Sequence, residues 1–135
     1  MNQRIIYSTD SGVSIIIPTP EALQTLTIDD IAKKDVPAGV AYKIVDTTDI
    51  PTDRTFRNAW KDDLTVDMPK AQEITKDRLR AERTPLLLAQ DVAYSRATET
   101  GADTTAIVAE KNRLRDVTKL VDTVATLEEL KALTP

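Results

Sequence analysis

The sequence of 135 residues contains neither cysteine nor histidine, and aromatic residues make up only 4% of it. Without cysteine the chain forms no disulfide and supplies no thiolate. Without histidine it has no histidine-based triad and no imidazole ligand for a metal. Because aromatic residues are scarce, the core must be built mainly from Ile, Leu, Val and Ala, and such a core favours support from a partner subunit.

Glycine is also scarce, and the three glycines stand apart from one another, so the chain has no glycine-rich loop for phosphate. Carboxylates are abundant, and Asp46, Asp49 and Asp53 cluster before the stretch FRNAW, as ligands of a hard cation can. Their spacing is not that of a calcium loop, and we interpret them as turn and capping residues. The serines and threonines have no recognisable base partner. We therefore expect no enzymatic activity, no cofactor and no metal.

The charge is weakly acidic, with a net value of −4. Residues 1–67 carry 7 Lys/Arg against 11 Asp/Glu, whereas residues 68–135 carry 11 of each. Neither half has the basic surface that nucleic-acid binding requires. Apolar runs such as Ile15 to Ile17 are far too short to cross a membrane, and the first ten residues lack the apolar stretch of a signal peptide. We expect a cytoplasmic protein with neither a nucleic-acid nor a membrane partner.

The first half predicts a small α+β unit over residues 1–67. Two β-branched runs, at 4–7 and 13–17, flank Asp10-Ser11-Gly12 and indicate a β-hairpin. The pair Thr27 and Asp30 is a variant capping box for a helix from residue 28 to about 34, and residues 42–46 form a third strand by residue type. We expect a short helix over FRNAW, because Phe56 and Trp60 are four residues apart and on a helix would share a face and pack together.

The second half, residues 68–135, predicts an antiparallel helical hairpin with a short terminal helix. The first arm begins after a capping Asp67 and runs to about residue 98, and Pro85 should kink it or start a new helix. Gly101 ends this arm, and a second arm then runs to about residue 120. The last helix, residues 127–133, starts with a capping box of Thr126 and Glu129.

Periodicity predicts which faces of the hairpin are buried. On the second arm a narrow apolar stripe marks a seam against one partner helix, while its basic side chains should point outward. The stripe consists of Ile107, Leu114, Val117, Val121 and Val124, and the outward side chains are Lys111, Arg115 and Lys119. The cluster RLRD (113–116) is then Leu114 in the seam with solvated charges beside it.

The first arm has two apolar faces about 140° apart. One face contains Ile74, Ala81, Leu88 and Val92, and the other contains Leu79, Leu86, Ala93 and Ala97. Two faces need two partners, so one face packs on the second arm and the other on the N-terminal half or on another subunit. The candidate partner-binding residues are Ile74, Leu79, Leu86, Val92, Leu114, Arg115, Phe56 and Trp60. We expect Arg78, Arg96 and Arg115 to add polar contacts at the rim of that surface.

Two stretches, RLRAERTPLLLAQDVAYSRA (78–97) and KNRLRDV (111–117), are followed by LEELKALTP. Together they resemble the tail assembly chaperones of tailed bacteriophages, including the tail-fibre assembly type, which tend to end in a helical hairpin with such motifs. The stretches RIIYSTDSGVSIIIP and PTDRTFRNAW also look like small proteins encoded among phage tail and structural genes. The chain departs from the group at its end, because it finishes Leu-Thr-Pro where members often have an aromatic residue before proline.

This resemblance implies a non-enzymatic tail morphogenesis protein that binds a tail or tail-fibre component in the cytoplasm of the infected host. The alternative is a permanent virion protein, such as a tail, head-tail or capsid-decorating subunit, whose partners are copies of itself. A small antitoxin-like regulator is a third reading, and the missing basic DNA-binding element disfavours it.

Overall fold

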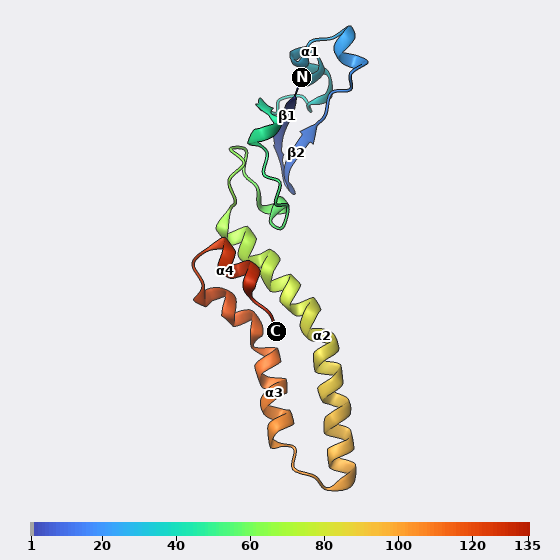
Figure 1. Ribbon diagram of the computed structural model, residues 1–135, viewed down its shortest axis with the longest axis vertical. Helices are drawn as coiled ribbons and strands as arrows, with labels where there is room; N and C mark the ends of the chain where they lie inside the picture. Colours follow the sequence, from blue (N-terminus) through green and yellow to red (C-terminus); the bar gives the residue numbers. More distant parts are fainter. Residues whose placement is uncertain (1) are drawn as a thin grey trace. The chain divides into compact units, whose positions relative to one another are not determined.

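The computed structural model describes residues 2–135 and has the predicted α+β fold. The chain divides into two compact units, residues 1–70 and 71–135, and each is described by itself. The N-terminal unit contains a small antiparallel sheet, and the C-terminal unit is helical (Figure 1). Among residues 2–135 no helix is both long enough and apolar enough to cross a membrane.

The sheet has three strands, β1 (Gln3–Thr9), β2 (Gly12–Ile16) and β3 (Tyr42–Asp46), in the order β2-β1-β3 with both pairs antiparallel. The predicted hairpin and third strand are therefore confirmed. Thr9 pairs with Gly12 across the turn, and Gly12 has a φ of 121°, which L side chains rarely adopt. A Cβ at Gly12 would also lie 3.2 Å from the Asn58 carbonyl oxygen, so this turn requires glycine.

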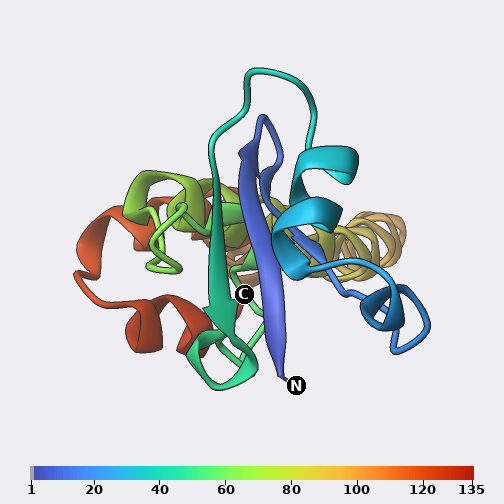
Figure 2. The ribbon, with the colours of Figure 1, turned by 90° about the horizontal axis from the view of Figure 1, so that it is seen from above.

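Both faces of the sheet are covered, because consecutive β1 residues point to opposite sides. Ile5 packs with Ile31 and Ala32 of helix α1 (Ile28–Asp35), which lies against one face (Figure 2). Ile6 packs on the other side with Ile50 and Trp60 from the segment that follows β3. Helix α1 has the predicted capping box, in which the Thr27 hydroxyl accepts from Asp30 N and Asp30 accepts from Thr27 N.

Short 3₁₀ turns connect these elements, namely η1 (Ala22–Gln24), η2 (Thr47–Asp49) and η3 (Arg57–Ala59). The predicted helix over FRNAW is wrong, because only the turn η3 forms there and Trp60 then pairs with Val66 in an isolated β-bridge. A further backbone bond joins Asp67 N to the Ala59 carbonyl. Phe56 and Trp60 are both buried, at 5% and 3% exposed, but they do not share a helical face.

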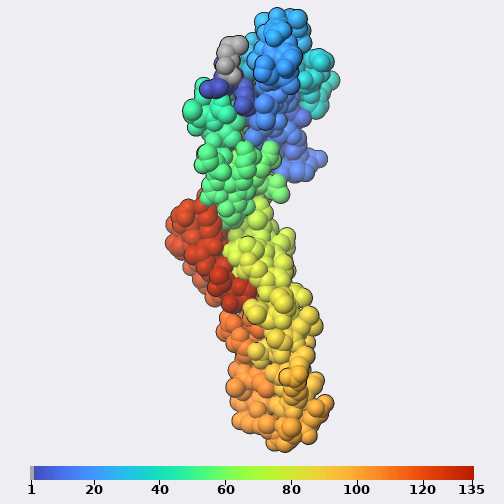
Figure 3. All heavy atoms as spheres, turned by 45° about the vertical axis from the view of Figure 1, so that its right-hand side comes forward, coloured from blue at the N-terminus to red at the C-terminus, as the bar shows by residue number. Residues whose placement is uncertain are grey.

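The C-terminal unit is the predicted helical hairpin. Helix α2 (Met68–Thr100) forms the first arm, and α3 (Thr105–Arg115) lies beside it and forms the second (Figures 1 and 3). A long 3₁₀ segment η4 (Val117–Thr123) and helix α4 (Leu127–Ala132) complete the chain. The predicted second arm is wrong in one respect, because α-helix ends at Arg115 rather than near residue 120.

Helix α2 continues through Pro85, so proline does not start a new helix here. Its first turn is capped by Asp67, whose carboxylate accepts from Lys70 N at 3.3 Å. It ends as predicted at Gly101, which has a φ of 70°, while Ala102 N donates back to the Ala97 carbonyl at 2.8 Å. This arrangement is a Schellman motif, which satisfies carbonyls that the helix leaves free.

Candidate functional site

The hairpin buries side chains only at one end, where the start of α2 packs on the end of α3, on η4 and on α4; we call this end the base. Its buried residues are Ala71, Thr75, Leu79, Leu114, Val117, Val121 and Leu130. The predicted seam of the second arm is thus confirmed at its three central positions, and Ile107 and Val124 are half-buried. Leu79 and Leu114 are 0% and 1% exposed, so these two candidate residues form the interior and present no surface to a partner.

Two arginines of α2 connect the arms at this base. Arg83 Nη1 donates to the carbonyl oxygens of Leu114 and Arg115 at 3.3 and 2.7 Å, and Arg78 Nη2 donates to the Leu130 carbonyl at 3.1 Å. These carbonyls lie in the last turns of α3 and α4, where the regular bonds of an α-helix run out. The Leu130 carbonyl also accepts from Leu133 N at 3.3 Å, so Arg78 adds a second bond to it. Arg78 is therefore a helix-capping residue of the hairpin, which corrects its expected position at a partner-binding rim.

The cluster RLRD forms the end of α3. Leu114 is buried, Arg113 binds Glu110 through two bonds of 2.6 and 2.9 Å, and Asp116 pairs with Lys119 at 3.0 Å. Arg115 is exposed and donates to the Asn112 side chain at 3.1 Å. The charged side chains of the RLRD cluster therefore have local partners on the surface.

Lys111 contradicts the prediction that it points outward. Its side chain is only 16% exposed, its Nζ lies 2.7 Å from Asp91 Oδ1 on the opposite arm, and it stands 5.1 Å from the centre of the Tyr94 ring. At about 100° per residue Lys111 lies roughly 60° from Leu114, which places it at the edge of the seam and not opposite it. The long aliphatic stem packs between the arms while the ammonium reaches the carboxylate.

Beyond this base the hairpin has no interior. In the described chain no residue of the segment 81–113, which we call the distal hairpin, is buried. Its seam positions Ala93, Ala97 and Ile107 are only half-buried. Large apolar side chains are instead exposed there: Leu86 43%, Leu88 60%, Val92 51%, Tyr94 37% and Val108 39%.

The most exposed of these side chains belong to one face of α2. Residues 81, 85, 88 and 92 recur at helical spacing, and we call the apolar row of Ala81, Pro85, Leu88 and Val92 the outer stripe. All four side chains are exposed. The two predicted faces of the first arm thus differ. One contributes Leu79, Ala93 and Ala97 to the seam, although Leu86 of the same predicted face is 43% exposed. The other face carries the outer stripe, with Ile74 half-buried nearer the base.

Titratable groups give no sign of acid-base chemistry on this hairpin. Bonds from Arg113 lower the pKa of Glu110, and bonds from the Thr105 hydroxyl and backbone N–H lower the pKa of Asp103. Both carboxylates lie at the surface and stay ionised near neutral pH. Among residues 2–135 no three acidic side chains gather closely enough to hold a metal ion, and Asp46 and Asp53 accept bonds from Thr48 and Thr55 as turn-capping residues do.

The remaining candidates, Phe56 and Trp60, lie in the N-terminal unit and are part of its interior. Sequence reasoning missed the capping role of Arg83 and the inter-arm pair of Lys111 and Asp91. The capping role of Arg83 has no local sequence signal, because Arg83 and Arg115 are far apart in sequence. The pair of Lys111 and Asp91 has one, since Lys111 lies near the seam in a helical projection.

Comparisons of the chain with protein-family models, with curated proteins and with solved structures give no match.

Proposed function

We propose that this protein is a non-enzymatic morphogenesis protein of a tailed bacteriophage, and that its distal hairpin binds a tail or tail-fibre component. The observation that carries the proposal is the exposed outer stripe on a segment without an interior. Leu88 and Val92 are 60% and 51% exposed on neighbouring turns, and the segment 81–113 buries no side chain of its own. Contiguous apolar surface of this kind is typical of protein-binding sites.

The geometry suits a helix-in-groove mode of binding. In that mode the apolar face of an amphipathic helix packs into a hydrophobic groove of the partner, with anchors three and four residues apart. Ala81, Pro85, Leu88 and Val92 follow this spacing. The caps from Arg78 and Arg83 fix the arms at the base, so the stripe is presented on a preformed helix and less entropy is lost on binding.

The phage assignment is supported by the resemblance of residues 78–97 and 111–117 to tail assembly chaperones. As a chaperone, the protein would act in the cytoplasm of the infected bacterium and cover apolar surface of its client until the client trimerises or docks.

A permanent virion subunit is the second candidate. The outer stripe also favours it, because a neighbouring copy in the particle would bury these exposed apolar side chains. Quantitative mass spectrometry of purified particles separates the two candidates. A chaperone is abundant in the infected-cell lysate and absent from particles, whereas a structural subunit occurs in a fixed small ratio to a tail or capsid protein. Absence from both would contradict the phage assignment altogether.

A further inference from the structure

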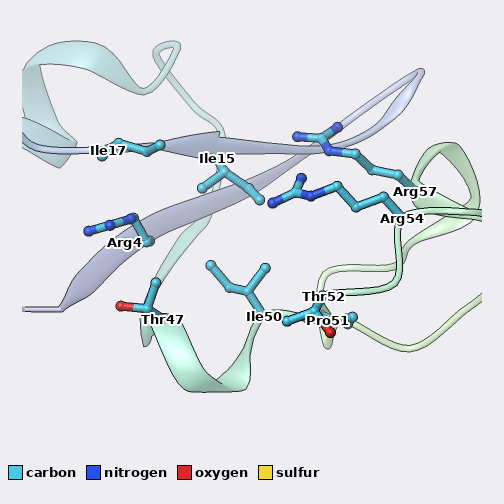
Figure 4. Close-up of a pocket in the computed structure, with 9 residues that line it drawn as sticks. All are labelled: Arg4, Ile15, Ile17, Thr47, Ile50, Pro51, Thr52, Arg54 and Arg57. Carbon is cyan, nitrogen blue, oxygen red and sulfur yellow. The ribbon is translucent and has the colours of Figure 1, made fainter.

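A pocket of about 350 Å³ in the N-terminal unit combines positive charge with an aliphatic floor. Arg4 reaches it from β1, and Arg54 and Arg57 reach it from the segment before and within η3 (Figure 4). The floor is formed by Ile15, Ile17 and Ile50. Ile17 is 64% exposed, which makes it the most exposed large apolar side chain of the described residues.

Among the described residues these three arginines form no ion pair with an acidic side chain. Arg4 does have one acidic neighbour, because bonds from Thr48 and, to a smaller extent, the charge of Arg4 lower the pKa of Asp46. No Asp or Glu lines the pocket, and within residues 2–135 neither Arg54 nor Arg57 has a carboxylate within ion-pair distance. Arg4 Nη1 donates to the Gln3 carbonyl at 3.0 Å. This arrangement stands out because residues 1–67 hold only 7 basic residues against 11 acidic ones, and three of the seven line one pocket.

Trp60 holds two of these arginines in place. The guanidinium carbons of Arg54 and Arg57 lie 5.9 and 5.7 Å from the centre of its ring, and the ring itself is 3% exposed. A guanidinium over an aromatic ring keeps the N–H donors in its own plane available for a carboxylate. The donors are thus ordered before any ligand arrives, which lowers the entropic cost of binding.

We propose that this pocket binds an acidic segment of a partner polypeptide, with glutamate or aspartate carboxylates on Arg54 and Arg57 and an aliphatic neighbour on Ile15 and Ile17. A free inorganic anion would use the arginines but leave the aliphatic floor uncovered. The floor residue Ile15 belongs to β2, which is an edge strand, so an extended segment has room to lie along it. This site does not depend on the distal hairpin, and either assignment stands if the other fails.

The test is an NMR titration of the full-length ¹⁵N-labelled protein with the pentapeptide acetyl-Ile-Glu-Ile-Glu-Ile-amide. The Trp60 indole N–H and the arginine Nε–H signals report on the pocket directly, because Trp60 is the only tryptophan. We expect saturable shifts of these signals that weaken as salt is added. The double variant Arg54→Gln/Arg57→Gln should raise the dissociation constant at least ten-fold, and Arg80→Gln, which removes an arginine outside the pocket, should leave it unchanged.

Arg4→Gln is a second variant that does not touch the Trp60 stack, and it should weaken the peptide several-fold even if the double variant folds poorly. The matched peptide with glutamine in place of glutamate, and inorganic phosphate alone, complete the experiment. Equal binding of the glutamine peptide would make the pocket an apolar groove and overturn the proposal. Saturation by phosphate without binding of the acidic peptide would reduce it to a simple anion site, and the absence of any saturable shift would also overturn it.

Discussion

Two arginines of α2, Arg78 and Arg83, connect this helix to α4 and α3. Arg83 donates to two carbonyls at the end of α3, and Arg78 donates to one in α4, so each cation lies at the negative end of a helix dipole. The arginine-rich stretch that resembles the tail assembly chaperones therefore has a structural role in this chain. Its side chains fix the second arm against the first.

Replacing Arg83 by methionine tests this capping role. The methionine keeps the aliphatic packing but removes both bonds to the carbonyls, and we expect the free energy of unfolding to fall by about 1 kcal/mol. The control is Arg80→Met, since Arg80 makes an exposed pair with Asp77 at 2.7 Å and such pairs contribute little. Urea denaturation followed by circular dichroism measures both changes. Equal losses for the two variants would contradict the capping role.

At the scale of elements, local signals in the sequence predicted most of the fold. The hairpin glycine, the capping box of α1 and the Schellman glycine after α2 act within a few residues, and their elements formed where expected. Elements determined by distant residues were predicted poorly. Helix α3 ends at Arg115 without a local Gly or Pro, because Arg83 supplies its cap from the other arm.

The prediction of a helix over FRNAW failed for the same reason, because residues distant in sequence determine the structure of this segment. The spacing of Phe56 and Trp60 fits a helix, but Trp60 instead pairs with Val66 and packs with Ile6 and Val13 of the sheet. Tertiary contacts thus overrode a local pattern of only five residues. Periodicity predicted a second apolar face on the first arm, whereas the exposure of that face and the lack of any interior in the distal hairpin required the structure.

Substitutions on the two sides of α3 should differ sharply in their effect on stability. Leu114 is 1% exposed, so Leu114→Asp buries an unpaired charge and should cost more than about 4 kcal/mol, which unfolds the hairpin. Arg115 is exposed, and Arg115→Ala should cost less than about 0.5 kcal/mol. Far-UV circular dichroism measures the loss of helix. If Arg115→Ala unfolds the protein, the surface position of its side chain is wrong.

Leu114→Asp also tests whether the N-terminal unit folds without the hairpin, because Trp60 emission reports on the first unit and the helical signal on the second. Trp60 lies in a cluster made of residues from the N-terminal unit, and its native emission should be blue-shifted. This emission should persist in Leu114→Asp while the helical signal falls. A red shift to the value of the denatured protein would show that the N-terminal unit requires the hairpin to fold.

For the whole molecule, the charges predict a simple dependence of stability on pH. Bonds from neighbouring threonines lower the pKa values of Asp30, Asp46, Asp63 and Asp103 below the ordinary value of 3.8. A carboxyl with a lowered pKa stabilises the folded state above its unfolded pKa, and this contribution is lost as pH falls through the folded pKa. The chain has no histidine, so no side chain with an ordinary pKa titrates between about pH 5 and 8.

We therefore expect the free energy of unfolding to stay level across that range and to fall below about pH 4. Urea denaturation at a series of pH values measures it. A drop in stability between pH 6 and 8 would contradict this expectation, because the chain has no histidine and the pKa values of these four aspartates are lowered, not raised.

We propose that the distal hairpin is covered by a phage tail or tail-fibre protein, and site-specific photocrosslinking in infected cells can detect that protein in place. A benzophenone amino acid is placed at Leu88 or Val92 on the outer stripe, and at Lys33 of α1 as an exposed control in the other unit. Crosslinks from positions 88 and 92 to one tail or tail-fibre protein, absent from position 33, are the predicted result. No crosslink from the stripe, or the same scattered products from all three positions, would contradict the claim.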